Sequence, residues 1–205
     1  MTEFEKMCAG KLYDPNDKEL IKLRRSAHQL SQVYNDTLEE ENDKRNEILD
    51  KLMPNKKEGS YLQGPVYFDY GINTHVGKNF YANFNFTCLD CAKITIGDHV
   101  FLGPNVSLLT PMHPFLPNER NPYLREDGVQ TDREYAKPII IESNCWICGN
   151  VTIVGGVKIG EGSIIGAGSV VTKSIPPYSL AAGNPCKVIR EISKKDSVYL
   201  KKELL

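Results

Sequence analysis

The four histidines of the sequence are the side chains best suited to take a proton near neutral pH. Imidazole has an ordinary pKa of about 6.5, so it can accept the proton of a hydroxyl group that is too weak an acid to ionise alone. His28, His75 and His99 fall in segments with a regular pattern, where a surface or packing role is expected. His113 lies in a long segment without a repeat, which is a usual place for function.

Two pairs of cysteines have the C-x-x-C spacing, which can hold zinc or carry redox chemistry. Cys88 and Cys91 form one pair, and Cys145 and Cys148 form the other. The gap between the pairs is much longer than a zinc ribbon prefers, and no βαβ pattern surrounds the second pair. We therefore expect all six cysteines to be reduced small residues, and we expect no metal site.

The composition indicates a single globular domain. The 205 residues include 25 basic and 26 acidic side chains, and 40% of the residues are apolar. A net charge of −1 argues against nucleic acid as a partner, because phosphate binding needs a basic surplus. No apolar stretch is long enough to span a bilayer, and residues 1–10 lack the apolar region of a secretory signal. We expect a cytoplasmic protein with no membrane partner.

Charge is concentrated in the segment 1–58, which holds close to half of the charged side chains of the chain. Apolar residues recur there at spacings of three and four, which predicts amphipathic helices. The positions with this spacing are Leu20, Ile21, Leu23, Ala27, Leu30, Val33 and Tyr34. Residues 1–58 are therefore expected to form an N-terminal helical cap segment whose apolar stripe packs on the rest of the protein.

From residue 139 onward the apolar period changes to six. The series consists of Ile141, Ile147, Ile153, Ile159, Ile165 and Val171. A six-residue period is typical of a hexapeptide β-helix, in which each hexad makes one short strand and one turn, and three hexads make one triangular coil. Because a fainter copy runs upstream, residues 59–189 are predicted to form this mainly β domain, with a tail over 190–205.

The series loses its register between Leu108 and Ile141, because the interval between these positions is not a multiple of six. The interval is rich in proline, asparagine and charged residues. We predict one long excursion loop over residues 109–138, which carries His113.

Short motifs along the whole chain add a second source of information. They are Met7-Cys8-Ala9-Gly10-Lys11-Leu12-Tyr13, Phe80-Tyr81-Ala82-Asn83-Phe84-Asn85, His113-Pro114, Lys137-Pro138-Ile139, Trp146-Ile147, the run from Ile165 to Lys173, Ala181-Ala182-Gly183-Asn184-Pro185 and Val188-Ile189-Arg190. Together they resemble the galactoside/maltose O-acetyltransferase family of hexapeptide acyltransferases, over about residues 3–193. The resemblance implies a left-handed parallel β-helix, acetyl-CoA as co-substrate, and a homotrimer whose active sites lie between adjacent subunits.

The resemblance also implies roles for individual residues. His113 would be the general base for direct attack of an acceptor hydroxyl on acetyl-CoA, without an acyl-enzyme. The backbone N–H of Gly149 would stabilise the oxyanion of the tetrahedral intermediate. The residues implied to bind acetyl-CoA are Asn83, Trp146, Gly149, Ala167, Thr172, Lys173, Lys187 and Arg190.

The acceptor implied by the resemblance is a small sugar. The residues implied to hold it are Asp14, Asp69, Tyr81, Asn83, Asp90 and Glu134. Glu134 is also a candidate to orient His113. Asp69 stands where galactoside acetyltransferases have serine, and Cys91 stands where their pattern has a second aspartate. The resemblance is therefore closer to the maltose acetyltransferase branch.

Other functions fit the same architecture. Zinc carbonic anhydrases of this fold need two histidines with H-x4-H spacing, which the sequence lacks. A non-catalytic hexapeptide scaffold is an alternative, although the joint presence of His113, Asn83 and Trp146 argues against it. Within acetyltransferases, an antibiotic or an oligosaccharide stays open as the hydroxyl acceptor.

Overall fold

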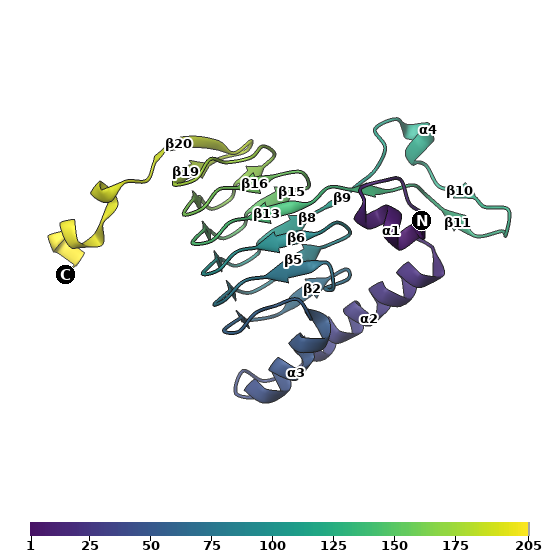
Figure 1. Cartoon of the computed structure of the whole chain (residues 1–205), viewed down its shortest axis with the longest axis horizontal. Coiled ribbons are helices and arrows are strands. Elements are labelled where there is room, and N and C mark those ends of the chain that lie inside the picture. Colours follow the sequence, from purple (N-terminus) through teal and green to yellow (C-terminus); the bar gives the residue numbers. More distant parts are fainter. Residues whose placement is uncertain (205) are drawn as a thin grey trace.

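The computed structural model describes residues 1–204 of the chain. Three helices lead into a stack of β coils, a long arm leaves the stack partway along it, and the C-terminal segment extends from the end opposite the helices (Figure 1). The helices are α1 (Glu3–Cys8), α2 (Lys18–Asn35) and α3 (Asn42–Leu52). The C-terminal segment holds three short 3-10 helices, η1 (Lys194–Asp196), η2 (Val198–Leu200) and η3 (Lys202–Leu204).

Local sequence explains where the first two helices begin. Thr2 and Glu5 form a reciprocal capping box at the start of α1. The side chain of Asp17 accepts hydrogen bonds from two backbone N–H groups in the first turn of α2. Helix α2 packs against strand β2 (Val66–Phe68) and against α3, so the predicted apolar stripe does pack on the rest of the protein. The buried residues of α2 are Leu20, Ala27, Ser31 and Tyr34.

The strands of successive coils form three sheets within residues 1–204. The seven-stranded sheet contains, in order, β1 (Tyr61–Leu62), β4 (Tyr81–Ala82), β7 (Phe101–Leu102), β14 (Trp146–Ile147), β17 (Ile164–Ile165), β19 (Ser179–Ala182) and β20 (Lys187–Glu191). The five-stranded sheet contains β18 (Val170–Val171), β15 (Thr152–Val154), β8 (Ser107–Leu109), β5 (Phe86–Leu89) and β2. The four-stranded sheet contains β16 (Lys158–Ile159), β13 (Ile139–Ile141), β6 (Ile94–Ile96) and β3 (Thr74–Val76). The pairings within the stack are parallel, except that β20 runs antiparallel to β19.

The register of these sheets confirms the hexapeptide repeat. Ile147 pairs with Ile165, three hexads further on, and the neighbouring pairs repeat this offset, which is one coil. Each member of the six-residue series from Ile141 to Val171 is 0% exposed. The branched side chains therefore point inward and stack into one continuous apolar column, as the period predicts.

The predicted excursion is an arm that interrupts one coil. An uninterrupted coil would pair Ile153 with Tyr135, three hexads earlier, but Ile153 pairs with Leu108, so the arm is inserted into that coil. Its elements are β9 (Pro111–Met112), α4 (Pro117–Arg120), β10 (Tyr123–Leu124), β11 (Gln130–Thr131) and β12 (Tyr135–Ala136). Antiparallel pairing joins β9 to β12 and β10 to β11, and the arm projects from the coils beside α1 (Figure 1).

Asparagine occupies several tight turns of the stack. Asn85, Asn105 and Asn150 have φ values of 59°, 59° and 57°, a left-handed conformation that asparagine tolerates better than most residues. Their side chains also form a ladder, because Asn85 donates to Asn105 at 2.9 Å and Asn105 donates to Asn150 at 3.1 Å. The ladder aligns successive turns along one edge of the stack.

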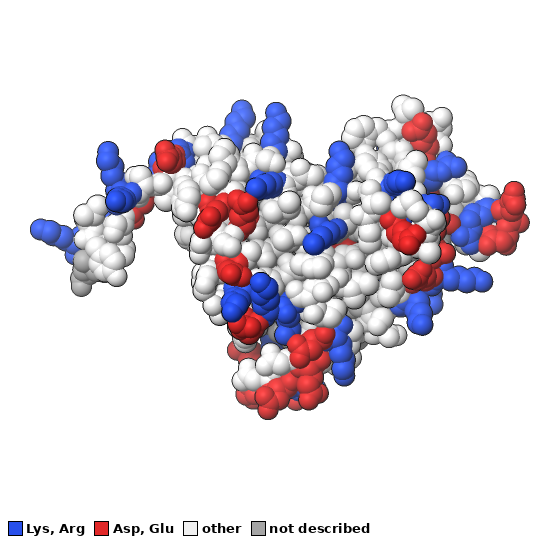
Figure 2. All heavy atoms as spheres, viewed as in Figure 1, with Lys and Arg blue, Asp and Glu red and all other residues white. Residues whose placement is uncertain are grey.

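Charge is unevenly distributed over the surface. Figure 2 shows many charged side chains over the helices and the arm, while the middle of the visible coil face carries few. No helix within residues 1–204 is both long enough and apolar enough to cross a membrane.

Candidate active site

His113 follows β9 at the base of the arm, and its side chain is 47% exposed. Its Nδ1 lies 3.3 Å from Oδ2 of Asp132, which follows β11. A carboxylate at one imidazole nitrogen selects the tautomer and the orientation of the ring. Nε2 is therefore the nitrogen that can take a proton from an acceptor. The folding of the arm brings these two residues together although they are well separated in the sequence.

Glu134, the expected partner of His113, has a different main contact. The Tyr13 hydroxyl donates a hydrogen bond to its Oε2 at 2.5 Å, and the Tyr13 backbone N–H donates to the Glu134 carbonyl at 2.9 Å. Burial raises the pKa of Glu134 above its ordinary value, although the bond from Tyr13 opposes the shift. Glu134 thus ties the N-terminal segment to the arm, and Asp132 is the carboxylate in contact with His113. Nothing in the spacing of the sequence distinguishes Asp132 from the other acidic residues of the arm, because its contact with His113 arises only when the arm folds.

His113, Asp132 and Glu134 also have the donor types of a metal site, since their donor atoms all lie within 4.8 Å of one another. Each carboxylate is already accounted for without a cation. Glu134 accepts from the Tyr13 hydroxyl, and Asp132 faces the imidazole. We therefore interpret the cluster as two carboxylates beside His113, one facing the imidazole and one hydrogen-bonded by Tyr13.

Asp14 is engaged with the arm. Its Oδ2 lies 2.6 Å from Nη1 of Arg125, and its Oδ1 accepts from the Thr131 hydroxyl at 2.5 Å and from the Asn16 N–H at 2.9 Å. Burial would raise the pKa of Asp14, but the hydrogen bonds from Thr131, Asn16 and Arg125 outweigh it and lower that pKa. Asp14 fastens the N-terminal segment to the arm, and both of its oxygens have partners.

Asp90, expected to hold the acceptor, is 0% exposed. Its Oδ1 accepts from the backbone N–H groups of Tyr70 and Gly71, at 2.8 and 3.1 Å. Its Oδ2 accepts from the Thr74 hydroxyl at 2.9 Å and from the Asn73 N–H at 3.2 Å. Burial raises the pKa of Asp90, although these hydrogen bonds oppose the shift. Asp90 therefore holds the backbone of residues 70–74 in place from the interior and is not exposed to an acceptor, which corrects the expectation from the sequence.

Asp69, directly after β2, has a partly exposed side chain. One carboxylate oxygen lies 3.5 Å from Nε2 of His28, and the Cys91 thiol lies 3.7 Å from the other. Asp69 therefore keeps access to solvent, unlike Asp90.

A second group of expected residues lies on the seven-stranded sheet. Tyr81, Asn83 and Trp146 share a surface cavity of about 410 Å³, and Trp146 is 52% exposed. The carbonyl oxygen of the Asn83 side chain accepts from the Phe84 N–H at 2.7 Å, which leaves its amide donors available. The lining residues are Tyr81, Asn83, Phe101, Leu102, Gly103 and Trp146, so His113 is not among them.

Gly149 and Ala167 continue this group along one edge of the stack, where the seven-stranded sheet turns into the five-stranded sheet. Ala167 stands one coil after Gly149, and the Gly168 N–H donates to the Gly149 carbonyl at 3.0 Å. The Gly149 N–H has no hydrogen-bond acceptor among residues 1–204, so it is free to serve an oxyanion. We call this row of Asn83, Trp146, Gly149 and Ala167 the glycine edge.

Thr172 and Lys173 lie at a different edge, after β18, where the five-stranded sheet turns into the four-stranded sheet. The arm leaves the stack at this same edge. Gly155, which follows β15, lies against the two residues where the arm begins and ends. A Cβ at Gly155 would lie 2.9 Å from the carbonyl oxygen of Thr110 and 2.8 Å from that of Lys137. We call this the arm edge. The expected residues of one chain therefore lie on two different edges, with His113 on the same edge as Thr172.

Two of the residues expected to bind acetyl-CoA, Lys187 and Arg190, lie in β20 and are exposed. Lys187 begins the strand. The Arg190 guanidinium forms a two-point ion pair with Asp196, at 2.7 and 2.9 Å. Arg190 would have to exchange this partner to bind a phosphate.

Known proteins share the sequence and the architecture. A family model described as maltose acetyltransferase hexapeptide capping motif matches residues 6–56, and one described as bacterial transferase hexapeptide (six repeats) matches residues 138–173. Galactoside O-acetyltransferase of Escherichia coli (strain K12) is 42% identical, over 97% of this chain and 94% of its own length.

Solved structures are similar over the same extent. A maltose O-acetyltransferase from Clostridium difficile 630 is 45% identical with a TM-score of 0.84, covering 95% of this chain and 99% of that chain. A galactoside acetyltransferase in complex with coenzyme A is 41% identical with a TM-score of 0.86, covering 96% and 94%.

A parallel β-helix of hexapeptide repeats, with an arm that carries an exposed and oriented histidine, defines a hexapeptide-repeat acyltransferase. The identities above 40% extend over nearly the full length of both chains. The chain therefore belongs to the galactoside/maltose O-acetyltransferase family, and this confirms the resemblance found in its motifs.

Proposed function

We propose that this protein transfers the acetyl group of acetyl-CoA to a hydroxyl group of a small sugar, with His113 as general base. The observation that carries the proposal is the exposed His113 imidazole, held by Asp132, in the arm of a hexapeptide acyltransferase. A thioester is already activated, so the main task of the protein is to remove the proton of a weakly acidic hydroxyl during its attack. Similar structures with coenzyme A and with acetyl coenzyme A support this donor.

In the proposed reaction, the acceptor oxygen attacks the thioester carbon directly while Nε2 of His113 takes the hydroxyl proton. The thioester oxygen becomes an oxyanion, and the free N–H of Gly149 is proposed to donate a hydrogen bond to it. When the tetrahedral intermediate collapses, the carbon–sulfur bond breaks and the proton on His113 passes to the leaving thiolate. The products are the acetylated sugar and free CoA, and no acyl-enzyme forms.

We further propose a homotrimer in which each active site lies between two subunits. The arm edge holds His113, Thr172 and Lys173, while the glycine edge holds the other expected acetyl-CoA residues. These edges are separated by a whole sheet within one triangular coil. A second copy that sets its glycine edge against the arm edge of the first would complete the site. Trp146 and Ala167 would then follow the pantetheine arm, and Lys187 and Arg190 the phosphates.

For the acceptor, we propose that the partly exposed Asp69 holds sugar hydroxyls, with Tyr81 and Asn83 facing it from the neighbouring subunit. Asp14 from the N-terminal segment and Glu134 from the arm would support the same site. The aspartate at position 69 and the cysteine at position 91 favour maltose or glucose over galactosides.

The proposal is tested by following the release of the CoA thiol from acetyl-CoA with maltose, glucose, methyl galactoside or chloramphenicol as acceptor. We expect release with maltose or glucose well above the rate without acceptor. Release with chloramphenicol alone, or with no sugar at all, would overturn the sugar acceptor. Failure to bind acetyl-CoA would overturn the donor and favour the scaffold alternative.

A further inference from the structure

Residues 131–134 form the part of the arm that lies beside the base, and we call them the support segment. Asp132 is the member of this segment that faces the His113 imidazole, at 3.3 Å. Thr131 and Arg133, on either side of Asp132, have no role in the reaction proposed above. The contacts of these neighbours decide how firmly Asp132 is held.

Thr131 ends β11 and is almost fully buried, with 2% of its surface exposed. Its hydroxyl donates a hydrogen bond to Oδ1 of Asp14 at 2.5 Å and accepts one from the side-chain amide of Asn16 at 3.2 Å. The same amide donates to the Gln130 carbonyl at 3.2 Å. Both partners of the Thr131 hydroxyl therefore belong to the N-terminal segment, far from Thr131 in the sequence.

The other end of the support segment is held by the same stretch of the N-terminal segment. The Tyr13 N–H donates to the Glu134 carbonyl at 2.9 Å, and the Glu134 N–H donates to the Tyr13 carbonyl at 3.2 Å. Residues 13–16 therefore fix the support segment at both of its ends, with Asp132 between the two points of contact.

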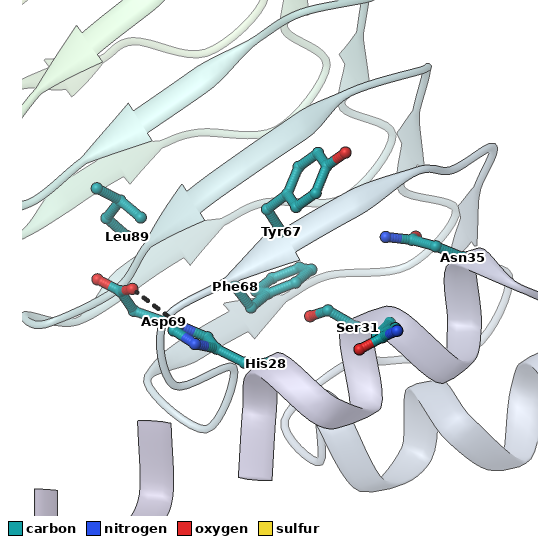
Figure 3. Close-up of a pocket in the computed structure, with 8 residues that line it drawn as sticks. His28, Ser31, Asn35, Tyr67, Phe68, Asp69 and Leu89 are labelled. Atoms are coloured by element: carbon teal, nitrogen blue, oxygen red, sulfur yellow. Dashed lines mark ion pairs between the residues drawn. The ribbon is translucent and has the colours of Figure 1, made fainter. Parts of the chain in front are cut away.

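Two of the other aspartates expected at the site have partners away from the base. Asp69 pairs with His28 of α2 at 3.5 Å, as Figure 3 shows. Asp14 accepts from Thr131, as described above. Asp132 is the aspartate in contact with the base, so a displacement of the support segment would act on the base through Asp132.

The arm needs outside contacts because its own strands are short. β10 and β11 have two residues each, and an isolated two-stranded hairpin is at best marginally stable in water. Within the arm, the Arg133 guanidinium lies 4.6 Å from the centroid of the Tyr123 ring, which is a cation–π contact. A misplacement of about 1 Å in a reacting group can cost about 100-fold in rate, so contacts that fix the neighbours of Asp132 matter for catalysis.

We propose that Thr131 is a positioning residue for the base, and that residues 13–16 act on catalysis by holding Asp132 in place through Thr131. The inference rests on the proposed function, since it adds a positioning residue to that same reaction. Thr131 touches neither the acceptor nor acetyl-CoA in this account. Its hydroxyl connects the N-terminal segment to the carboxylate that orients His113.

The test compares Thr131→Val with Thr131→Ser by acceptor-dependent CoA release. Valine keeps the shape of threonine but lacks the hydroxyl, so we expect kcat to fall by about tenfold. The KM for acetyl-CoA should not change, because most of the residues expected to bind it lie on the glycine edge. Serine keeps the hydroxyl and should retain most of kcat. Thr95→Val is the matched control, because Thr95 lies on the four-stranded sheet and not in the arm, and it should leave kcat unchanged.

A double-mutant cycle separates positioning from a general loss of structure. If Thr131 acts through Asp132, adding Thr131→Val to Asp132→Asn should change kcat by less than about twofold, because the contact that Thr131 supports is already lost. Calorimetric titration with acetyl-CoA counts the folded sites of each variant, so that kcat is expressed per site.

Asn16→Ala is the second variant if Thr131→Val does not fold. Asn16 is only partly buried, and its amide donates to the Thr131 hydroxyl and to the Gln130 carbonyl. Asn16→Ala should lower kcat in the same direction, and it should lose this effect when it is combined with Asp132→Asn.

The outcomes separate the two levels of the proposal. Unchanged kcat in Thr131→Val, an equal loss in Thr131→Ser, or losses that multiply with that of Asp132→Asn would overturn the positioning role while the sugar acetyltransferase activity stands. No turnover of any sugar by the unaltered protein would overturn the proposed function and the positioning role with it.

Discussion

His113 and Asp132 form the central contact of the molecule at the scale of single residues. His113 could be selected from the sequence because it is the one histidine of the four that lies in the predicted excursion loop. Asp132 could not, because its distance from His113 depends on how the arm pairs β9 with β12 and β10 with β11. Charged partners that meet through a non-repeating segment leave no periodic signal in the sequence.

Asp132→Asn tests whether this carboxylate positions the base. The amide still fits the space, but it does not favour the imidazole orientation and charge that proton transfer requires, so we expect kcat to fall by about 10- to 100-fold. The KM for acetyl-CoA should not change. Asp127→Asn is the control, because Asp127 is exposed on the same arm and pairs with Arg125. Unchanged kcat in Asp132→Asn would contradict the assignment.

Asp90 is a residue that the sequence suggested but that the structure buries. Its residue type and the family resemblance pointed to a role in binding the acceptor, but the burial of a single carboxylate cannot be predicted from the sequence. The structure surrounds it with four donors inside a turn. A buried carboxylate with enough hydrogen bonds can stay inside a protein, and this one organises the backbone.

At the scale of elements, the coils were the most predictable part. An inward residue in every hexad repeats through the sequence, so the strands, their offset of three hexads and the apolar column could all be expected. The helices were predictable as a group but less so in detail. Val33, for example, belongs to the apolar series of α2 and is nevertheless 49% exposed. The buried stripe of a helix depends on which surface receives it, and the spacing alone does not fix its width.

Ile153→Ala tests the apolar column in the middle of the stack. Ile153 is 0% exposed, and its truncation should lower the free energy of unfolding by about 2–5 kcal/mol, because it leaves a cavity between coils. Ile140→Ala is the control in a neighbouring coil, since Ile140 points outward and is 38% exposed. It should cost less than about 1 kcal/mol. Equal costs in denaturant titrations at a fixed protein concentration would contradict the inward role of the series.

The stabilisation that Asp14 provides between the N-terminal segment and the arm should depend on pH. Asp14 has a lower pKa in the folded protein than in the unfolded chain, so its charged form stabilises the fold. This contribution is complete above the unfolded pKa, and it is lost as the pH falls through the lowered folded pKa.

Asp14→Asn removes the ion pair with Arg125 but keeps a side chain of the same size. The melting temperature of the variant should lie below that of the unaltered protein at pH 7, and the difference should shrink below about pH 4. A difference that stays constant from pH 7 to pH 3 would show that the Asp14 charge does not stabilise the connection.

At the scale of the whole molecule, the expected site residues of one chain lie on two edges, and this division is the reason for proposing a second copy. No single-residue pattern in the sequence reveals this division, because the edges exist only after the coil has closed into three sheets. The proposed homotrimer should have a mass of about three times 23.0 kDa by light scattering.

Mixing two inactive variants tests where the active site lies. His113→Ala removes the base from the arm, and Asn83→Ala removes a contact from the glycine edge. If each site uses the arm of one subunit and the glycine edge of the next, unfolding and refolding the two variants together should restore about one quarter of the sites. No recovery in correctly assembled mixed trimers would contradict a shared site.

The most direct test of the central claim is acceptor-dependent CoA release by His113→Ala beside the unaltered protein. We expect the variant to bind acetyl-CoA with unchanged affinity and to lose about 100-fold or more in kcat, because the variant lacks the group that takes the proton of the attacking hydroxyl. Turnover of the sugar at the normal rate in His113→Ala would contradict the account.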